Sequence, residues 1–215
     1  ITQKKKELFW PLVFLWVVLI LSLVLFLNNL RLDYKNVDLV VKSFKIPNII
    51  NKIVYTFFRD SKAKKSYENS LKIEGFAPKP IGFIEFKKFG LINESYFVSE
   101  NFKYDFTIRE PLLQADFKDK EEVFKAFARF TYKLHEQGIF HLDYSPGNIL
   151  IKEENEDYIF KIVDINRMEF KHLSLDERLK NFAKLWAKDE DLKIIIKEYS
   201  KLTESDEEGC IRIAL

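Results

Sequence analysis

Four polar residues in the second half of the chain have types and spacing that suit chemistry at a hydroxyl group beside a hard cation. In chain order they are His141, Asp143, Asn148 and Asp164. A carboxylate such as that of Asp143 can orient an attacking hydroxyl and accept its proton. Asn148 and Asp164 offer side-chain oxygens, the ligand type that Mg²⁺ prefers. We therefore expect these residues to act together in one cleft.

The segments between these residues indicate how they meet. Residues 145–147, Ser-Pro-Gly, have the composition of a turn and let the chain fold back between Asp143 and Asn148. Two short apolar strands follow, separated by an acidic turn, and the second strand ends at Asp164. This pattern predicts a hairpin that returns Asp164 to the side of Asn148.

The order His-x-Asp-x-x-x-x-Asn, hairpin, Asp is the layout of a kinase catalytic loop followed by a metal-binding Asp. Two details differ from protein kinases. Leu142 stands where they usually carry Arg, and Ile-Asn-Arg at residues 165–167 replaces Phe-Gly after Asp164. In these details the sequence resembles the lipopolysaccharide kinase (Kdo/WaaP) family, and the resemblance extends over about residues 28–215.

The resemblance implies transfer of a phosphoryl group from ATP to a sugar hydroxyl of the lipopolysaccharide inner core, either Kdo or heptose. Asp143 would orient the hydroxyl, while Asn148 and Asp164 would bind Mg²⁺ and, through it, ATP. His141 is expected to brace the loop by hydrogen bonding. Arg167 would hold the acceptor or stabilise phosphoryl charge, and a structural salt bridge is an equal alternative.

The upstream part of the chain predicts a small sheet that would hold the ATP phosphates. Two strands joined by a Lys-Asn turn are expected within residues 30–44, and a hairpin within residues 81–100. Lys42 lies late in the second strand, in a Val-Val-Lys-Ser-Phe setting. The resemblance assigns it to the nucleotide phosphates; the alternative is a strand lysine that faces solvent.

Two helices are expected between these strands, at about residues 49–58 and 61–74. Three residues at four-residue spacing predict the buried face of the second helix: Ala63, Tyr67 and Leu71. The resemblance assigns Glu68, which follows Tyr67, as the carboxylate that pairs with Lys42. Glu74, nearer the helix end, is the alternative.

The segment after Arg167 is short and its pattern is helical. Ser174 and Glu177 form a capping box, and helices are expected after it, at about residues 189–202 and from residue 206. A helix is expected to begin directly at this capping box, before the other two, and its predicted face is Leu179, Phe182, Ala183 and Trp186. There is no room for the large helical lobe by which protein kinases hold peptides, which favours a small or glycolipid acceptor.

These elements predict a protein-kinase-like α+β fold with two lobes. The N-lobe, residues 28–108, is atypical or truncated, and the C-lobe, residues 109–215, is short and helical. Apolar residues make up 47% of the chain, enough for a core. The 35 basic and 33 acidic residues nearly balance, which gives no general attraction to nucleic acid. The single cysteine, Cys210, excludes a disulfide framework and fits a reducing compartment.

The first 27 residues contain a hydrophobic run from Phe9 to Leu27 without a charge, and we expect a membrane-spanning helix there. The catalytic part would then face the cytoplasm at the inner membrane, where ATP is found; if this segment is not native, the protein would be cytoplasmic. In a kinase, a glycine-rich loop is expected at the place in the sequence that this run occupies. No glycine precedes Gly75, so the loop is missing or replaced. The helix expected at residues 61–74 carries a basic face. This face is either solvated or contacts anionic lipid head groups or the phosphates of lipid A; its members are Lys62, Lys64, Lys65 and Lys72.

Two other functions are compatible with the sequence. One is a kinase of another acceptor, a protein or a small molecule. The other is a non-catalytic, kinase-like relative, suggested by the missing glycine-rich loop. The intact Asp143, Asn148 and Asp164 argue against the second.

Overall fold

The computed structural model describes residues 29–34, 37–45, 48–155 and 157–215. No helix within these ranges is long and apolar enough to cross a membrane. The hydrophobic helix expected at residues 9–27 lies outside the described residues, as does the place expected for a glycine-rich loop. Both therefore stay predictions.

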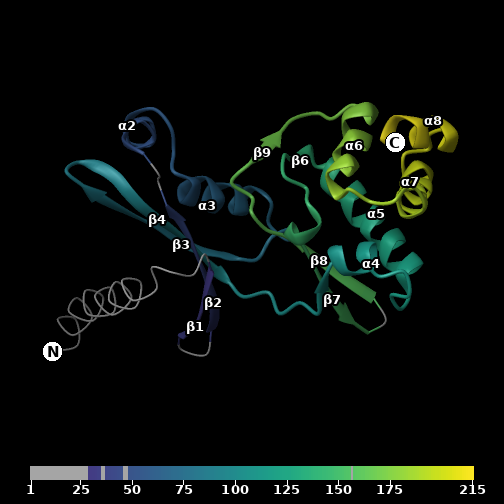
Figure 1. Cartoon of the computed structure of the whole chain (residues 1–215), viewed down its shortest axis with the longest axis horizontal. Helices are drawn as coiled ribbons and strands as arrows, with labels where there is room; N and C mark the ends of the chain where they lie inside the picture. Colours follow the sequence, from purple (N-terminus) through teal and green to yellow (C-terminus); the bar gives the residue numbers. More distant parts are fainter. Residues whose placement is uncertain (1–28, 35–36, 46–47, 156) are drawn as a thin grey trace.

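The N-lobe is built on a four-stranded antiparallel sheet, on the left in Figure 1. Its strands are β1 (Asn29–Tyr34), β2 (Val37–Lys45), β3 (Pro80–Lys88) and β4 (Leu91–Glu100), in the order β1-β2-β4-β3. Both predicted strand pairs are confirmed. The register pairs Lys42 of β2 with Phe97 of β4, so the lysine lies in the middle of the sheet.

Two helices accompany this sheet, as expected. Helix α2 (Ile49–Phe57) follows β2, and helix α3 (Lys62–Lys72) begins after the N-cap Ser61. Helix α3 packs on the sheet through Ala63, which is fully buried.

The predicted buried face of α3 is partly wrong. Ala63 is buried, but Leu71 is 56% exposed, and the serines Ser66 and Ser70 are buried instead. The small serine side chains allow α3 to approach the sheet and the second lobe closely. Hydrophobic spacing alone does not identify such a face.

The chain leaves the N-lobe sheet at Glu100 and enters a second sheet at Phe106. This sheet contains β5 (Phe106–Thr107), β7 (Ile149–Glu154) and β8 (Asp157–Ile162), in the order β5-β7-β8. The predicted hairpin before Asp164 is β7–β8. Because β5 pairs with β7 of the C-lobe, we propose that the lobes divide within residues 101–105, slightly before the expected boundary after residue 108.

The C-lobe is completed by helices around one large core (Figure 1). They are α4 (Arg109–Leu113), α5 (Lys120–Glu136), α6 (Leu175–Asn181), α7 (Asp189–Leu202) and α8 (Glu207–Ala214). Two short strands, β6 (Ile139–His141) and β9 (Met168–Phe170), pair with each other. In the sequence, β6 precedes the β7–β8 hairpin and β9 follows it. Phe124, Phe127 and Phe182 are fully buried at the centre of this core.

The predicted helix after residue 174 begins as expected but ends early. Ser174 and Glu177 form the capping box, and α6 then gives way to a 3₁₀ turn, Phe182–Leu185. Trp186 follows with φ of +49° and is 77% exposed. Its prediction as a core residue was wrong because the turn rotates it out of the helical face.

Candidate active site

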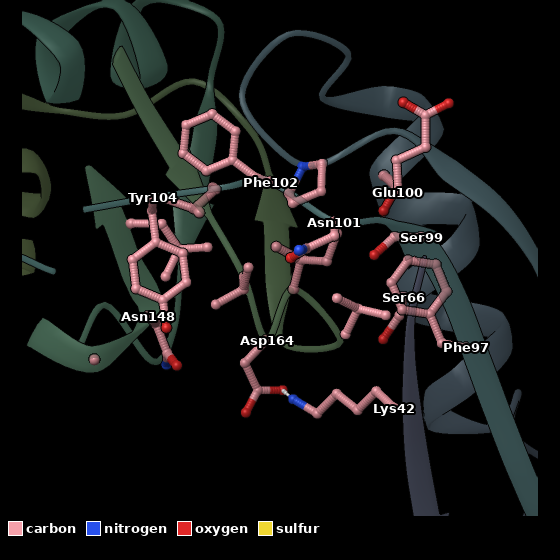
Figure 2. A pocket seen from close by; sticks show the side chains of 18 residues that line it. Lys42, Ser66, Phe97, Ser99, Glu100, Asn101, Phe102, Tyr104, Asn148 and Asp164 are labelled. Atoms are coloured by element: carbon pink, nitrogen blue, oxygen red, sulfur yellow. Dashed lines mark ion pairs between the residues drawn. The ribbon is translucent and has the colours of Figure 1, made fainter. Parts of the chain in front are cut away.

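A cavity of about 310 Å³ lies between the two lobes (Figure 2). The N-lobe sheet contributes Val40, Lys42 and Phe97 to its wall, and α3 contributes Ser66 and Ser70. The connection between the lobes and the C-lobe supply most of the remaining lining: Asn101, Phe102, Tyr104, Asn148, Leu150, Ile162 and Asp164. Residues far apart in the sequence therefore meet in one cleft, as the sequence predicted for Lys42, Asn148 and Asp164.

Lys42 and Asp164 form an ion pair across this cleft. The Lys42 Nζ atom lies 2.8 Å from Asp164 Oδ1, and Figure 2 shows the two side chains meeting from opposite lobes. Both side chains are about one-quarter to one-third exposed, so water and a ligand can reach them.

The backbone at Asp164 is in the left-handed region, with φ of +58°. Such a conformation is uncommon outside glycine, although Asp tolerates it better than most residues. The amide of Asn166 contacts Asp164 Oδ1, and the Asn69 amide of α3 donates to the Ile165 carbonyl at 2.6 Å. These contacts hold the turn that aims the Asp164 carboxylate into the cavity.

His141 is fully buried and joins the two halves of the motif. Its Nδ1 accepts the Asp143 backbone N–H at 3.0 Å, so Nε2 carries the proton and donates to the Val163 carbonyl at 3.0 Å. Burial lowers the pKa of His141 and keeps the imidazole neutral, which this arrangement requires. His141 is thus a positioning residue between the loop and the strand that ends before Asp164.

Asn148 is oriented by the same loop. Its side-chain amide nitrogen donates to the Asp143 carbonyl at 2.9 Å, and its backbone carbonyl accepts from Val163 N at 2.9 Å. With the nitrogen engaged by Asp143, the amide oxygen is the end of the side chain left for a cation in the cavity. Burial lowers the pKa of His141, and the negative charges of Asp143 and Asp164 oppose this shift without reversing it.

A second buried histidine, His135, is connected to the loop by a chain of hydrogen bonds. Tyr199 of α7 donates to His135 Nδ1 at 2.9 Å, and His135 Nε2 donates to Asn181 Oδ1 at 3.2 Å. The Asn181 amide in turn donates to the His141 carbonyl at 3.1 Å. Burial lowers the pKa of His135 to about 4, so this relay of hydrogen bonds contains a neutral imidazole at physiological pH.

Of the predicted site residues, Glu68 does not lie beside Lys42. Glu68 lies near Lys64, with Nζ and Oε1 3.7 Å apart, whereas the carboxylate beside Lys42 is that of Asp164. Glu74, the alternative, lies beyond the end of α3. Arg167 has an exposed side chain, and its backbone carbonyl accepts from Leu142 N at 3.1 Å. Its predicted part in acceptor binding stays a prediction.

A comparison with protein-family models matches residues 61–207, more than half of the chain, to the lipopolysaccharide kinase (Kdo/WaaP) family. The chain belongs to this family. It is therefore a kinase of lipopolysaccharide biosynthesis, and a kinase of this kind uses ATP. The predicted family and class of enzyme are confirmed.

Among solved structures, the chain is similar to WaaP in a complex with acyl carrier protein. The TM-score is 0.54 at 14% identity, and the match covers 86% of this chain and 77% of that chain. This likeness confirms the predicted two-lobe, kinase-like fold. No curated protein matches the sequence.

The structure adds residues to this kinase cleft that the sequence did not indicate. The Arg109 guanidinium lies against Gly147, in the loop between Asp143 and Asn148: a Cβ built on Gly147 would be 2.9 Å from Arg109 Nη2. The Ser70 hydroxyl is buried at the cavity wall and has no hydrogen-bond partner among the described residues. Arg109 gave no sequence signal because it reaches the loop only through the pairing of β5 with β7.

Proposed function

We propose that this kinase transfers the γ-phosphoryl group of ATP to a hydroxyl of an inner-core sugar of lipopolysaccharide, Kdo or heptose. The observation that carries the proposal is the convergence of Lys42, Asn148 and Asp164 on one cavity, with Asp143 on the adjoining loop. Phosphoryl transfer depends mainly on such positioning and on neutralising phosphate charge.

The shape and lining of the cavity support an adenine site. Val40 of β2 and Leu150 of β7 present apolar side chains from opposite lobes, and Phe97 and Ile162 extend the apolar wall. The connection at Asn101 and Phe102 closes one side and can offer backbone groups to a base edge. A cavity with apolar walls and a few polar groups at its rim suits a purine.

The donor set at the other end fits Mg²⁺. Asn148 and Asp164 offer oxygen donors, and Mg²⁺ commonly takes one or two protein ligands and completes its octahedron with phosphates and water. Lys42 and Asn166 both contact Asp164 Oδ1, so Oδ2 takes part in neither contact. When bound, Mg²⁺ would neutralise charge on the ATP phosphates. Lys42, which already lies beside Asp164, would steady the same phosphates.

In the proposed reaction, the acceptor hydroxyl oxygen forms a bond to the γ-phosphorus as the bond from phosphorus to the β–γ bridging oxygen breaks, and ADP leaves. Asp143 orients the hydroxyl and accepts its proton. The Arg109 side chain lies against Gly147 and the Arg167 backbone contacts Leu142, so the two residues meet the loop that carries Asp143 at different points, and both are exposed. They would suit an acceptor rich in carboxylate and phosphate groups.

The location of the enzyme follows from its substrates. Lipopolysaccharide core is assembled on a lipid, and ATP is found in the cytoplasm. We therefore place the two lobes at the cytoplasmic face of the inner membrane, with residues 9–27 as the proposed span.

The proposal is tested with the full chain, Mg-ATP and lipid A acceptors that end in Kdo or in heptose. Mass spectrometry should detect one added phosphate on one of the two acceptors. Asp143→Asn should reduce the rate about 10²–10⁴-fold, the usual contribution of a general base. Asp116→Asn, an exposed substitution elsewhere, should leave it unchanged.

Transfer only to a peptide or a small molecule would reassign the acceptor. ATP binding without transfer to any acceptor would indicate a non-catalytic relative.

A further inference from the structure

Helix α2 has its apolar and polar faces reversed relative to a helix of a globular protein. Ile50, Ile53 and Phe57 recur at spacings of three and four, and they are 69%, 42% and 68% exposed. Together with Ile49 and Phe58, which are 60% and 77% exposed, we call them the α2 apolar stripe. No residue of α2 is buried. An apolar stripe normally faces the protein core.

The polar face of α2 is the one that contacts the protein. Lys52 Nζ donates to Asn93 Oδ1 at 2.5 Å, and the Thr56 hydroxyl accepts from Ile92 N at 2.9 Å. Both partners belong to β4, so these contacts fix the rotation of α2 and turn the apolar stripe outward. Figure 1 shows α2 beside the tip of the β3–β4 hairpin, away from the helical lobe. The tip itself carries Phe89, which is 93% exposed.

Basic side chains lie beside the C-terminal end of the stripe. A hollow of about 560 Å³ beside Phe57 and Phe58 is lined by four basic residues: Arg59, Lys64, Lys65 and Lys87. Two carboxylates line it as well, Asp60 and Glu85, and Asp60 pairs with Lys64 at 2.6 Å. Lys88 and Lys45, both exposed, extend the basic region along the hairpin and the end of β2.

An outward apolar stripe next to an excess of basic side chains matches the chemistry of one kind of surface. Amphipathic helices with apolar residues on one side and Lys or Arg around them lie in the interface of a bilayer, where they contact acyl chains and anionic head groups together. A protein partner would need to match both features in one fold; a bilayer with anionic lipids supplies them without a specific fit.

We propose that the α2 apolar stripe and the tip at Phe89 dock in the interface of an anionic lipid bilayer, with the basic hollow binding lipid phosphates. This contact is separate from the proposed span at residues 9–27 and does not rest on the phosphotransfer proposal. It holds the N-lobe against the membrane and fixes how the cleft faces a lipid-linked acceptor.

The test places single nitroxide labels on the full chain bound to vesicles containing phosphatidylglycerol. Cys210, which is 2% exposed, is replaced by alanine in every variant so that only the new cysteine reacts. The labelled positions are Ile53→Cys and Phe57→Cys on the stripe. Leu113→Cys and Trp186→Cys, 74% and 77% exposed on the C-lobe, are the matched controls. Paramagnetic relaxation by oxygen reports lipid exposure, and a water-soluble nickel chelate reports water exposure.

Labels at 53 and 57 should relax mainly with oxygen, and those at 113 and 186 mainly with the nickel chelate. Vesicles of phosphatidylcholine alone, or the triple variant Arg59→Glu, Lys65→Glu and Lys87→Glu, should reduce the lipid exposure of the stripe at least several-fold. Because the readout needs no ATP, it is independent of whether the chain transfers phosphate.

Two results would overturn the proposal. Water exposure at 53 and 57 while the chain is on vesicles would mean that the chain is tethered elsewhere. Protection from both reagents would mean that protein covers the stripe, either residues 1–28, a second copy or another partner.

Discussion

At the scale of single residues, the cleft is organised by the pairing of Lys42 with Asp164. This ion pair, at 2.8 Å, takes the place of the lysine–glutamate pair that the kinase resemblance suggested. Helix geometry explains why the ion-pair partner of Lys42 is Asp164 and not Glu68. Successive residues advance about 100° around a helix, so Glu68 lies roughly opposite Ser66, which faces the cavity.

We expect Lys42→Ala and Glu68→Ala to differ strongly. Lys42→Ala should lower kcat/KM for ATP by about 10²-fold or more, since it removes a charge at the phosphates in a partly enclosed site. Glu68→Ala should change it less than about 3-fold, because the ion pair of Glu68 within the described residues is with Lys64, at a partly solvated surface. Steady-state kinetics with varied ATP measures both. Equal losses would show that Glu68 reaches Lys42 during turnover.

The residues of the catalytic motif could be predicted because their spacing is local. His141, Asp143 and Asn148 lie within one loop, and the hairpin returns Asp164 in register. Glu68 could not be predicted in the same way, since its direction depends on the rotation of α3. That rotation is set by Ala63 and by two serines that a hydrophobic pattern does not reveal.

At the scale of elements, α3 is joined to the C-lobe by one buried hydrogen bond, from Asn69 to the Ile165 carbonyl. We expect Asn69→Ala to lower the free energy of unfolding by about 1–3 kcal/mol, because it leaves a buried carbonyl without its partner. It should also raise KM for ATP, because the bond to Ile165 helps to hold the turn that aims the neighbouring Asp164 into the cavity. Lys62→Ala, at the exposed start of the same helix, is the control for urea unfolding. A stability loss equal to that of the control would contradict this role.

Helices α5, α6 and α7 are connected by the relay through His135, and this relay responds to acid. The fold keeps His135 neutral, with its pKa lowered to about 4, whereas in the unfolded chain it binds a proton near pH 6.5. The unfolded state therefore takes up the proton first as pH falls. The stability contribution is complete above about pH 6.5, falls with decreasing pH and is lost by about pH 4.

From pH 7 to pH 5 we expect His135 to account for a loss of about 2 kcal/mol in the free energy of unfolding. The lowered pKa of His141 acts in the same direction. Urea unfolding at several pH values should show that the free energy of unfolding depends less steeply on pH in His135→Gln than in the wild type. This holds even though the variant is less stable at pH 7. If the free energy of unfolding depended on pH as steeply in the variant as in the wild type, His135 would be excluded as a source of the acid sensitivity.

Elements with long or periodic patterns were the ones that the sequence predicted well. Helix α7 has the bounds expected. The short strands β5, β6 and β9 and the helix α4 were not predicted, because segments of two to five residues are too short to show a periodic pattern. Their pairing depends on the surrounding core, and β5 is also what brings Arg109 to the loop.

At the scale of the whole molecule, the two lobes differ in the size of their cores. The described part of the N-lobe has two small apolar clusters, one at Val41 and Tyr96 and one at Phe44, Ala63 and Phe97. The C-lobe has one large, continuous core. Less buried apolar surface means a lower free energy of local opening. The N-lobe should therefore be the less stable half.

We expect backbone amides of β2 and β4 to exchange hydrogen faster than those of α5 and β7 in the absence of nucleotide. Because we propose that Mg-ATP binds between the lobes, it should slow exchange in β2 and β4 most. Hydrogen exchange with mass spectrometry measures this directly. Equal protection of both lobes without nucleotide, or no effect of Mg-ATP on the N-lobe, would contradict this expectation.

The claim on which the rest depends is that the cavity between the lobes binds Mg-ATP. Isothermal titration calorimetry of the full chain in detergent, beside Asp164→Ala and the exposed control Asp116→Ala, tests it most directly. We expect one Mg-ATP per chain in the wild type and the control, with a Kd between about 1 μM and 1 mM, the usual range of substrate affinities. Asp164→Ala should weaken binding at least about ten-fold, or 1.4 kcal/mol. No binding to the wild type, or equal binding to all three proteins, would contradict the assignment of this cavity.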